Sequence, residues 1–223
     1  MNELSAVVIG ATGLTGNFLV EELLKDNAFK IVRILVRKPV KILHPKLQQE
    51  IINFNDINDF ADKFGEGDVI FCCIGTTQKK VKNDKIAYEK IDFDIPVNAA
   101  RIGISKNFKK YLIVSAIGAN EKSSNFYLKL KGKTENALKQ FPFESISIFR
   151  PSILIGQRNE FRFGEKIIHA ITEVFSFLFF GMLRKYHSID ALNVAKAMVK
   201  QSKSNEPGLH YFEYDGMMDL ARI

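Results

Sequence analysis

Three side chains in the middle of the chain have types and spacing that suit proton transfer. Tyr127 and Lys131 are four residues apart, so on a helix they project from one face. A tyrosine hydroxyl has an unperturbed pKa of about 10, and an ammonium within roughly 4 to 6 Å lowers it by about 1 to 3 units. Ser115 ends an apolar run 12 residues before the tyrosine, where its hydroxyl could bond a substrate oxygen. The pattern predicts a catalytic set, and a solvated helix face is the alternative.

The first predicted binding element lies near the start of the chain. Ala6 to Ile9 is typical of a short buried strand, and an apolar-periodic helix begins near Leu14. Between them, glycines at i, i+3 and i+6 let the chain turn, let backbone N–H groups approach a pyrophosphate, and let the helix pack on the sheet. The helix N-terminus adds free donors and a positive dipole end. Nucleotide binding is therefore predicted for Gly10, Ala11, Thr12, Gly13, Leu14, Thr15 and Gly16, with an ordinary turn as the alternative.

The second strand ends in basic residues. Ile31 to Arg37 is a β-rich run that Arg37-Lys38-Pro39 terminates. In dinucleotide-binding folds an acid at this strand end accepts the 2′-hydroxyl of NAD, whereas a basic residue accommodates the 2′-phosphate of NADP. Because Arg37 and Lys38 stand here and no acid does, we expect NADP(H) to be preferred, with NAD(H) as a second candidate. Two solvated basic side chains are the alternative.

Two further strand ends supply candidate cofactor contacts. Ile51 to Phe54 predicts a third strand, after which Asn55-Asp56 leads into a short helix through Phe64. Asp56 either touches adenine or only caps that helix, and Ile57 beside it is a further candidate cofactor contact. Asp68 to Thr77 predicts a fourth strand buried on both faces, and its exit loop adds Ile74, Gly75, Thr76 and Thr77. A helical stretch from Ala87 to about Ile104 follows, and Pro96 should kink or divide it.

The order of the elements predicts an α/β fold. Lys110 to Ser115 and Ser145 to Phe149 are the expected fifth and sixth strands, and Gly208 to Glu213 is the expected last one. Strands that alternate with helices through short turns give a doubly wound parallel sheet, the Rossmann fold. The length of 223 residues suits a single domain, residues 1–223, in which residues 151–223 form a small substrate-side or lid region.

These motifs together resemble the short-chain dehydrogenase/reductase superfamily. The loop Val114 to Ala119, with Ser123 to Tyr127 and Lys131-Gly132, is similar to its atypical group typified by the Tat-interacting oxidoreductase-like proteins. The resemblance implies an NADP-bound Rossmann domain with Ser115, Tyr127 and Lys131 as catalytic triad. It also implies that Pro151, Ser152 and Ile153 border the nicotinamide. The sequence departs from the family at residues 74–77, where an asparagine-alanine-glycine turn is frequent, and Asn98 is only a candidate for the fourth catalytic residue.

The amino-acid composition indicates which classes of ligand and which cellular compartment to expect. The net charge of +7 favours an anionic ligand, but the lysines are scattered and no nucleic-acid motif accompanies them, so nucleic-acid binding rests on charge alone. Cys72 and Cys73 are adjacent and have no other cysteine to pair with, which predicts buried free thiols in a reducing compartment. Residues 1 to 10 do not read as a signal peptide, so we expect a cytoplasmic protein. No metal site is predicted.

The 167–183 stretch is apolar but interrupted by His169, Glu173 and Gly181, and it is shorter than a membrane span. We expect it to cap the substrate cleft or to form a contact between copies of the chain. The whole pattern predicts an NADP(H)-dependent oxidoreductase that acts on a small-molecule carbonyl/alcohol pair. The alternative is a non-catalytic NADP(H)-binding regulator, with a protein contact through residues 175–180.

Overall fold

The computed structural model describes residues 3–156 and 181–222. Residues 1–2, 157–180 and 223 lie outside the described part. His169, the 175–180 surface and most of the apolar 167–183 stretch fall there, so the predictions made for them remain predictions.

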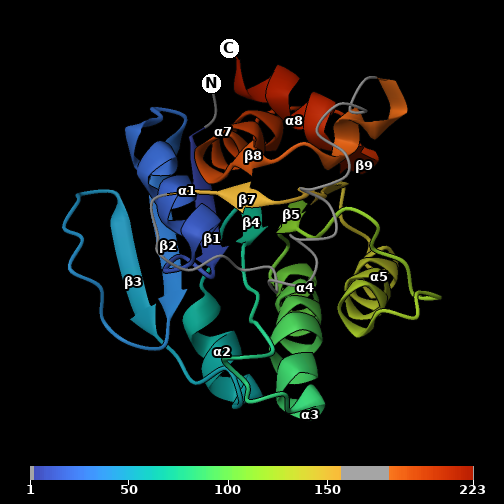
Figure 1. Cartoon of the computed structure of the whole chain (residues 1–223). Coiled ribbons are helices and arrows are strands. Elements are labelled where there is room, and N and C mark those ends of the chain that lie inside the picture. Colours follow the sequence, from blue (N-terminus) through green and yellow to red (C-terminus); the bar gives the residue numbers. More distant parts are fainter. Residues whose placement is uncertain (1–2, 157–180, 223) are drawn as a thin grey trace.

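A seven-stranded parallel sheet forms the centre of the molecule, as Figure 1 shows. Its strand order is β3-β2-β1-β4-β5-β6-β9, which reverses direction between β1 and β4. The predicted doubly wound sheet is thereby confirmed, and its switch point lies where such folds bind ligands. The strands are β1 (Leu4–Ile9), β2 (Phe29–Val36), β3 (Leu47–Ile51), β4 (Val69–Cys72), β5 (Lys110–Val114), β6 (Ser145–Phe149) and β9 (Gly208–Phe212).

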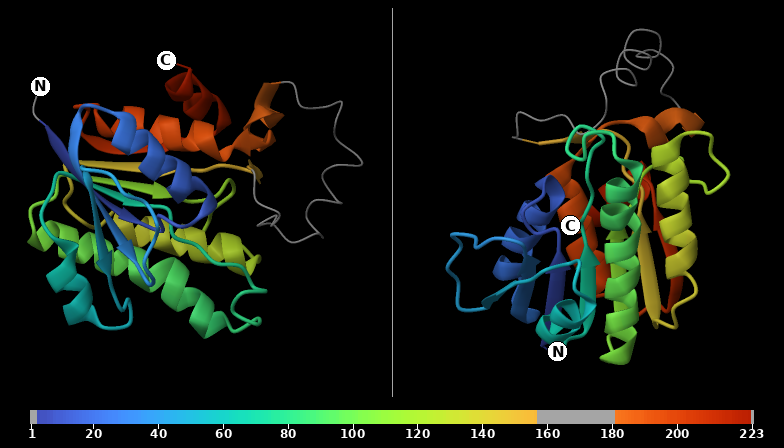
Figure 2. Two further views of the ribbon diagram at one scale, coloured as in Figure 1. Left: turned by 90° about the vertical axis from the view of Figure 1, so that its left-hand side faces the viewer. Right: turned by 90° about the horizontal axis from the view of Figure 1, so that it is seen from below.

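Helices cover both faces of this sheet, so the molecule has three layers (Figure 2). Alternate strand residues point to opposite faces, which divides the core in two: Val8 and Phe71 belong to one cluster, and Val7 and Ile70 to the other. One layer consists of α1 (Leu14–Lys25), α7 (Ala191–Ser202) and α8 (Tyr214–Ala221); the other consists of α2 (Ile57–Phe64), α4 (Ile95–Ser105) and α5 (Phe126–Leu138).

The third strand differs from its prediction. It spans Leu47–Ile51 and pairs with β2, where Val32 faces Leu47, whereas the sequence favoured Ile51 to Phe54. β3 is one of the two edge strands of the sheet, and its side chains Gln48 and Gln49 are exposed. An edge strand needs little apolar character, so its sequence carries a weak strand signal.

Pro96 divides its helical stretch as predicted, and it does so through a π-helical turn. α3 (Lys85–Glu89) continues into η1 (Lys90–Asp94) and then α4, where the Ile95 N–H donates to the carbonyl of Lys90, five residues earlier. Proline has no N–H for the carbonyl four residues before it. That carbonyl belongs to Asp92, and it accepts a hydrogen bond from Thr134 Oγ1 at 3.0 Å. The turn thus fixes Asp92 against α5.

The chain after residue 150 contributes both to the main sheet and to a separate small sheet. β7 (Leu154–Ile155) and β8 (Ile189–Asp190) form a small parallel pair, and the 3-10 helix η2 (Gly181–Tyr186) comes shortly before β8. β9 then extends the main sheet beside β6, and α7 packs on α1. Among residues 3–156 and 181–222, no helix is both long and apolar enough to cross a membrane.

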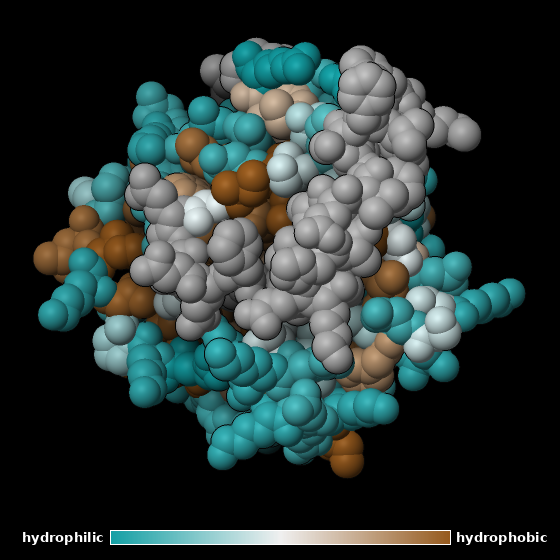
Figure 3. All heavy atoms as spheres, viewed as in Figure 1, coloured by the Kyte–Doolittle hydropathy of each residue, from teal (hydrophilic) through white to brown (hydrophobic). Residues whose placement is uncertain are grey.

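Exposed hydrophobic side chains gather at the left edge of the face drawn in Figure 3, in the region of the loop before β3. Leu43 in that loop is 98% exposed. Hydrophilic side chains cover most of the lower half of the same face.

Candidate active site

The glycine turn after β1 has a backbone that only glycine tolerates. Gly10 has φ +84°, and a Cβ there would lie 2.6 Å from the carbonyl carbon of Cys73. A Cβ on Gly16 would lie 2.1 Å from the Gly10 carbonyl oxygen. The Gly13 N–H closes the turn by donating to that oxygen at 2.9 Å. The turn, the start of α1 and the end of β4 therefore press together without side chains between their backbones.

The N-terminus of α1 at this turn can receive an anion. Gly13 precedes the helix and supplies no side-chain cap, and the first turn contains no acidic residue. Unsatisfied N–H groups and the positive end of the helix dipole suit a phosphate group. The turn therefore fits the pyrophosphate of a dinucleotide, as the spacing of its glycines predicts.

A pocket beside this turn brings the three predicted catalytic side chains together. It lies at the carboxyl ends of β1, β4, β5 and β6, and Ser115, Tyr127 and Lys131 share it with five further predicted residues. Its lining consists of Thr15, Cys73, Ile74, Gly75, Thr76, Asp92, Val114, Ser115, Tyr127, Lys131, Pro151 and Leu154. The sequence did not single out Cys73, Asp92, Val114 or Leu154 for this site.

Lys131 forms a buried ion pair in the pocket. Its Nζ lies 3.0 Å from Asp92 Oδ1, and the two side chains are 6% and 1% exposed. Burial alone would lower the pKa of Lys131, but the charges of Asp92 and Tyr127 raise it above its ordinary value. The other carboxylate oxygen of Asp92 accepts from the Thr76 N–H at 2.8 Å. Asp92 therefore keeps the ammonium charged and in place.

Lys131 also lies beside Tyr127, as the four-residue spacing predicts. Its Nζ is 6.0 Å from the centroid of the tyrosine ring. Gly75 leaves room next to the ion pair, because a Cβ there would lie 3.4 Å from Asp92 Oδ1 and 3.9 Å from the lysine Nζ. The ammonium is thus shared between a carboxylate and the tyrosine, and the carboxylate offsets part of its charge.

Ser115 is held by a second buried carboxylate. Its hydroxyl donates to Glu135 Oε1 at 2.5 Å, and both residues are buried. Arg150 donates to the same Glu135 side chain through Nε at 3.0 Å and through its second terminal nitrogen at 2.5 Å. The bond to Glu135 raises the pKa of Arg150, so this guanidinium stays charged.

Neither carboxylate was part of the predicted site, although the sequence contains a signal for each. Asp92 lies four residues before Pro96, so its carbonyl is the one that the proline, which has no N–H, leaves without a helical partner. Glu135 lies four residues after Lys131, on the same face of α5. Asn98 does not reach the pocket; its Oδ1 accepts from Arg101 Nη1 at 3.0 Å.

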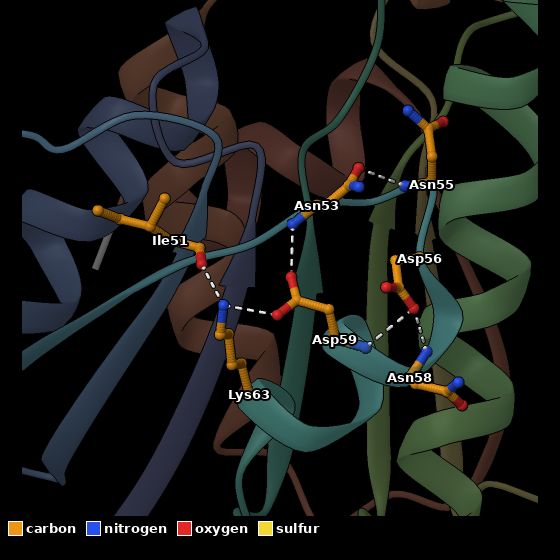
Figure 4. Close-up of polar contacts among 7 residues, drawn as sticks. All are labelled: Ile51, Asn53, Asn55, Asp56, Asn58, Asp59 and Lys63. Atoms are coloured by element: carbon orange, nitrogen blue, oxygen red, sulfur yellow. Dashed lines mark hydrogen bonds and ion pairs between the residues drawn. The ribbon is translucent and has the colours of Figure 1, made fainter.

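The residues predicted to follow β2 and β3 lie at the carboxyl ends of these strands. Because the strands are parallel to β1, this is the edge of the sheet that carries the glycine turn. Arg37 and Lys38 are exposed directly after β2, the neighbour of β1. Asp56 caps α2: its Oδ1 accepts from the N–H groups of Asn58 at 3.0 Å and Asp59 at 3.3 Å (Figure 4). The cap is confirmed, and the adenine contact stays a prediction. Ile57, which follows it, is 45% exposed.

A hydrogen-bond network holds this loop in position (Figure 4). Asp59 Oδ2 accepts from the Asn53 N–H at 2.7 Å, and Lys63 pairs with Asp59 Oδ1 at 2.6 Å. The Asn53 N–H and the Lys63 ammonium lower the pKa of the Asp59 carboxyl. Lys63 also donates to the Ile51 carbonyl at 2.8 Å. The helix cap at Asp56 is therefore tied to the end of β3.

The remaining predicted residues lie around these elements. Pro151 lines the pocket, whereas the Ser152 hydroxyl donates to the His187 carbonyl and the Ile153 carbonyl accepts from the Ile189 N–H at 2.9 Å. The last two thus connect the end of β6 to β8. Thr77 Oγ1 accepts from the Lys80 N–H at 3.3 Å, outside the pocket lining.

Three members of the glycine loop face other neighbours. The side chain of Leu14 lies against Gly156, where an added Cβ would meet it at 2.5 Å. Ala11 and Thr12 line a second pocket of about 340 Å³, between α1 and the loop after β2. The other residues of this pocket are Asn17, Val20, Ile34, Val40, Lys41 and Ile42.

The buried cysteines agree with the prediction for them. Cys72 and Cys73 are buried and form no disulfide. Burial raises the pKa of the Cys72 thiol, which keeps it in the unreactive protonated form.

Two known proteins are similar to this chain over most of its length. The chain is 29% identical to Protein HTATIP2 of Rattus norvegicus over 230 aligned residues, which cover 100% of this chain and 91% of that protein. It is 32% identical to the mitochondrial Protein FMP52 of Kluyveromyces lactis, with 77% of this chain and 78% of that protein covered. Because that relative is named mitochondrial, the cytoplasmic location expected from the sequence stays a prediction.

Solved structures show the same fold. MoeE5 in complex with UDP-glucose and NAD superposes with a TM-score of 0.70 at 14% identity, covering 97% of this chain and 80% of that one. Vestitone reductase from alfalfa has a TM-score of 0.63 at 16% identity, with 94% and 76% covered. The family model described as NAD(P)H-binding matches residues 10–159, about two thirds of the sequence. The chain therefore belongs to the NAD(P)H-binding family.

Proposed function

We propose that the protein is an NADP(H)-dependent oxidoreductase that interconverts an alcohol and a carbonyl compound. The observation that carries this proposal is the meeting of Ser115, Tyr127 and Lys131 in one pocket beside the glycine turn. Ser115 directly follows β5, and Tyr127 and Lys131 lie one turn apart on α5. The pocket that they share lies at the switch point of the sheet.

The residues around the turn suit a nicotinamide dinucleotide. The glycine turn and the N-terminus of α1 would hold the pyrophosphate, and Arg37 would pair with a 2′-phosphate. Gly75, Thr76 and Pro151 would border the nicotinamide end. When bound, the nicotinamide supplies or accepts the hydride.

The chain's own side chains would move the proton. Tyr127 would donate its phenolic proton to a carbonyl oxygen, or accept one from an alcohol. Lys131 would favour the phenolate, although Asp92 at 3.0 Å offsets part of its charge. Ser115 would hydrogen-bond the reacting oxygen.

The charges at the pocket favour an uncharged reacting group. Asp92 pairs with Lys131, and Glu135 pairs with Arg150. The other lining residues are apolar or carry hydroxyl or thiol groups. Both cations are thus already neutralised by a carboxylate of the protein. A substrate with a carboxylate at its reacting carbon would gain little electrostatic attraction from either pair. We expect neutral carbonyl compounds and alcohols to be the substrates.

Tyr127→Phe tests the proposal. The variant should lose turnover in a screen of neutral carbonyl compounds with NADPH, because it lacks the only transferable proton of that ring. Its affinity for NADPH should stay within about twofold of the native value, since the glycine turn is untouched. Lys133→Ala, an exposed change on the same helix, is the matched control and should leave both quantities unchanged. Full turnover in Tyr127→Phe would end the proposal.

A cofactor-sensing regulator is the second candidate function. The observation in its favour is that buried carboxylates hold both the Lys131 ammonium and the Ser115 hydroxyl. A protein partner whose binding changes with NADPH, in native protein and in Tyr127→Phe alike, would support this function.

A further inference from the structure

One buried carboxylate oxygen in the pocket lacks a hydrogen-bond donor. Among residues 3–156 and 181–222, Asp92 Oδ1 is the only buried side-chain oxygen or nitrogen without a hydrogen-bond partner. Lys131 Nζ lies 3.0 Å away, so the two charges attract each other, but the contact lacks the geometry of a hydrogen bond. The other oxygen, Oδ2, already accepts from the Thr76 N–H at 2.8 Å. Buried polar atoms are rarely left unpaired, so Oδ1 is suited to a donor that a ligand brings.

The space next to this oxygen lies over Gly75. A Cβ on Gly75 would be 3.4 Å from Asp92 Oδ1 and 3.9 Å from Lys131 Nζ. Apart from Gly75 and its two chain neighbours, no other described atom lies within 4 Å of that position. All three residues line the pocket beside the glycine turn. A ligand group that lies over Gly75 would therefore contact the carboxylate oxygen and the ammonium at once.

The chemistry of these two neighbours selects a hydroxyl group. An ionised carboxylate only accepts hydrogen bonds, and an ammonium only donates them. A hydroxyl donates its proton to the first and offers a lone pair to the second, whereas a carbonyl oxygen or an amide N–H group serves only one of them. The glycine turn fits the pyrophosphate of a dinucleotide, and Arg37 marks the adenosine side of that turn. The hydroxyls that reach this pocket therefore belong to the ribose at the nicotinamide end.

Resting on the proposed function, we infer that Asp92 is a cofactor-binding residue whose Oδ1 accepts a hydrogen bond from a hydroxyl of the nicotinamide ribose. Lys131 donates to the same hydroxyl and stays paired with the carboxylate. Through its other oxygen Asp92 also holds the Thr76 N–H, and with it the loop after β4 that borders the nicotinamide end. The buried ion pair thus binds the ribose directly, in addition to keeping the lysine charged.

Calorimetry with NADPH and with 2′,5′-ADP, which lacks the nicotinamide ribose, tests the inference without a substrate. Gly75→Ala fills the space beside Oδ1 and leaves the ion pair in place, because its Cβ makes an ordinary contact at 3.4 Å. It should weaken NADPH binding about tenfold or more, as for a lost bond to a charged group, and change 2′,5′-ADP binding less than about twofold. Gly216→Ala, with its Cβ 3.4 Å from a Phe212 ring carbon, is the matched control and should change neither affinity. Equal losses for both compounds, or no loss for NADPH, would overturn the inference.

Analogues of NADPH that lack one hydroxyl of the nicotinamide ribose separate the role of Asp92 from that of Lys131. Of the 2′-deoxy and 3′-deoxy analogues, at least one should bind native protein about tenfold more weakly than NADPH. In Asp92→Asn, whose amide oxygen stays on the Thr76 N–H, that analogue and NADPH should bind within about twofold of each other. Lys131 is still present in this variant, so a difference that persists there would assign the hydroxyl to the lysine alone and overturn the inference. If Asp92→Asn does not fold, the same comparison is made in Gly75→Ala.

The outcomes distinguish the inference from the proposed function. If native protein binds neither NADPH nor 2′,5′-ADP, both are contradicted. If native protein binds NADPH more tightly than 2′,5′-ADP, and Gly75→Ala and Asp92→Asn keep that ratio of affinities, other residues hold the nicotinamide half. In that case the inference about Asp92 is wrong, and the proposed function stands.

Discussion

Replacing Asp92 by asparagine should destabilise the protein more than its small change in shape suggests. The amide oxygen can still accept from the Thr76 N–H, now bonded at 2.8 Å. The Lys131 ammonium, 3.0 Å from the carboxylate and 6% exposed, would lose its counterion in the interior. Breaking one side of a buried ion pair costs about 3–5 kcal/mol. That is a large share of the roughly 5–15 kcal/mol by which a domain is stable.

The pH dependence follows from the direction of the lysine pKa. In native protein Asp92 holds the pKa of Lys131 above its ordinary value. The pair therefore contributes its full stabilisation below the unfolded pKa of about 10.4, and loses it only as pH rises through the higher folded pKa. In Asp92→Asn, burial would lower the lysine pKa, so the penalty should be largest at low pH and shrink as pH rises through the lowered value.

Urea unfolding at pH 7 and pH 9 measures both effects. Lys131 should contribute equally to the free energy of unfolding of the native protein at both pH values. The difference in this free energy between native protein and Asp92→Asn should be smaller at pH 9 than at pH 7. Adding Lys131→Met to Asp92→Asn should recover most of the loss, because no unpaired charge remains buried. A loss below about 1 kcal/mol at pH 7, or no recovery in the double variant, would refute the assignment of this pair as buried and charged.

Three other changes probe the surrounding elements. Gly16→Ala should abolish NADPH binding in calorimetry, since its Cβ would lie 2.1 Å from the Gly10 carbonyl oxygen and force α1 away from the turn. Arg37→Ala should weaken NADPH binding about tenfold or more and leave NADH binding unchanged, as measured by paired titrations. Thr134→Val should cost about 1–3 kcal/mol in urea unfolding, because the buried Asp92 carbonyl would lose the partner now at 3.0 Å.

Matched changes control these experiments. Gly216→Ala places a Cβ of α8 3.4 Å from a ring carbon of Phe212 at the end of β9, an ordinary contact, so it should leave cofactor binding intact. Lys38→Ala removes the exposed basic neighbour of Arg37. If Lys38→Ala lowers NADPH affinity and Arg37→Ala does not, the phosphate contact belongs to the lysine.

Buried strands and the glycine turn could be predicted because their constraints are local. The β4 strand, from Val69, is apolar on both faces, as a strand between two helix layers must be. Gly10 needs a positive φ that other residues rarely adopt. β3 was misplaced by several residues, since the exposed edge strand around Gln48 and Gln49 lacks those constraints.

The candidate site was predicted in its residue types and missed in its charge partners. The spacing of Tyr127 and Lys131 indicates a shared helix face without the fold. The pairing of Lys131 with Asp92 depends on a π-helical turn, and that of Ser115 with Glu135 on where α5 lies relative to the end of β5. Such contacts join residues 20 or more positions apart, and spacing along the chain does not specify them.

The account depends most directly on cofactor binding at the glycine turn. Titration of the purified native protein with NADPH and with NADH by calorimetry, at one fixed moderate salt concentration, measures it. We predict saturable one-to-one binding with a clear preference for NADPH. If neither dinucleotide binds, the glycine turn only joins β1 to α1, and the proposed oxidoreductase function is contradicted.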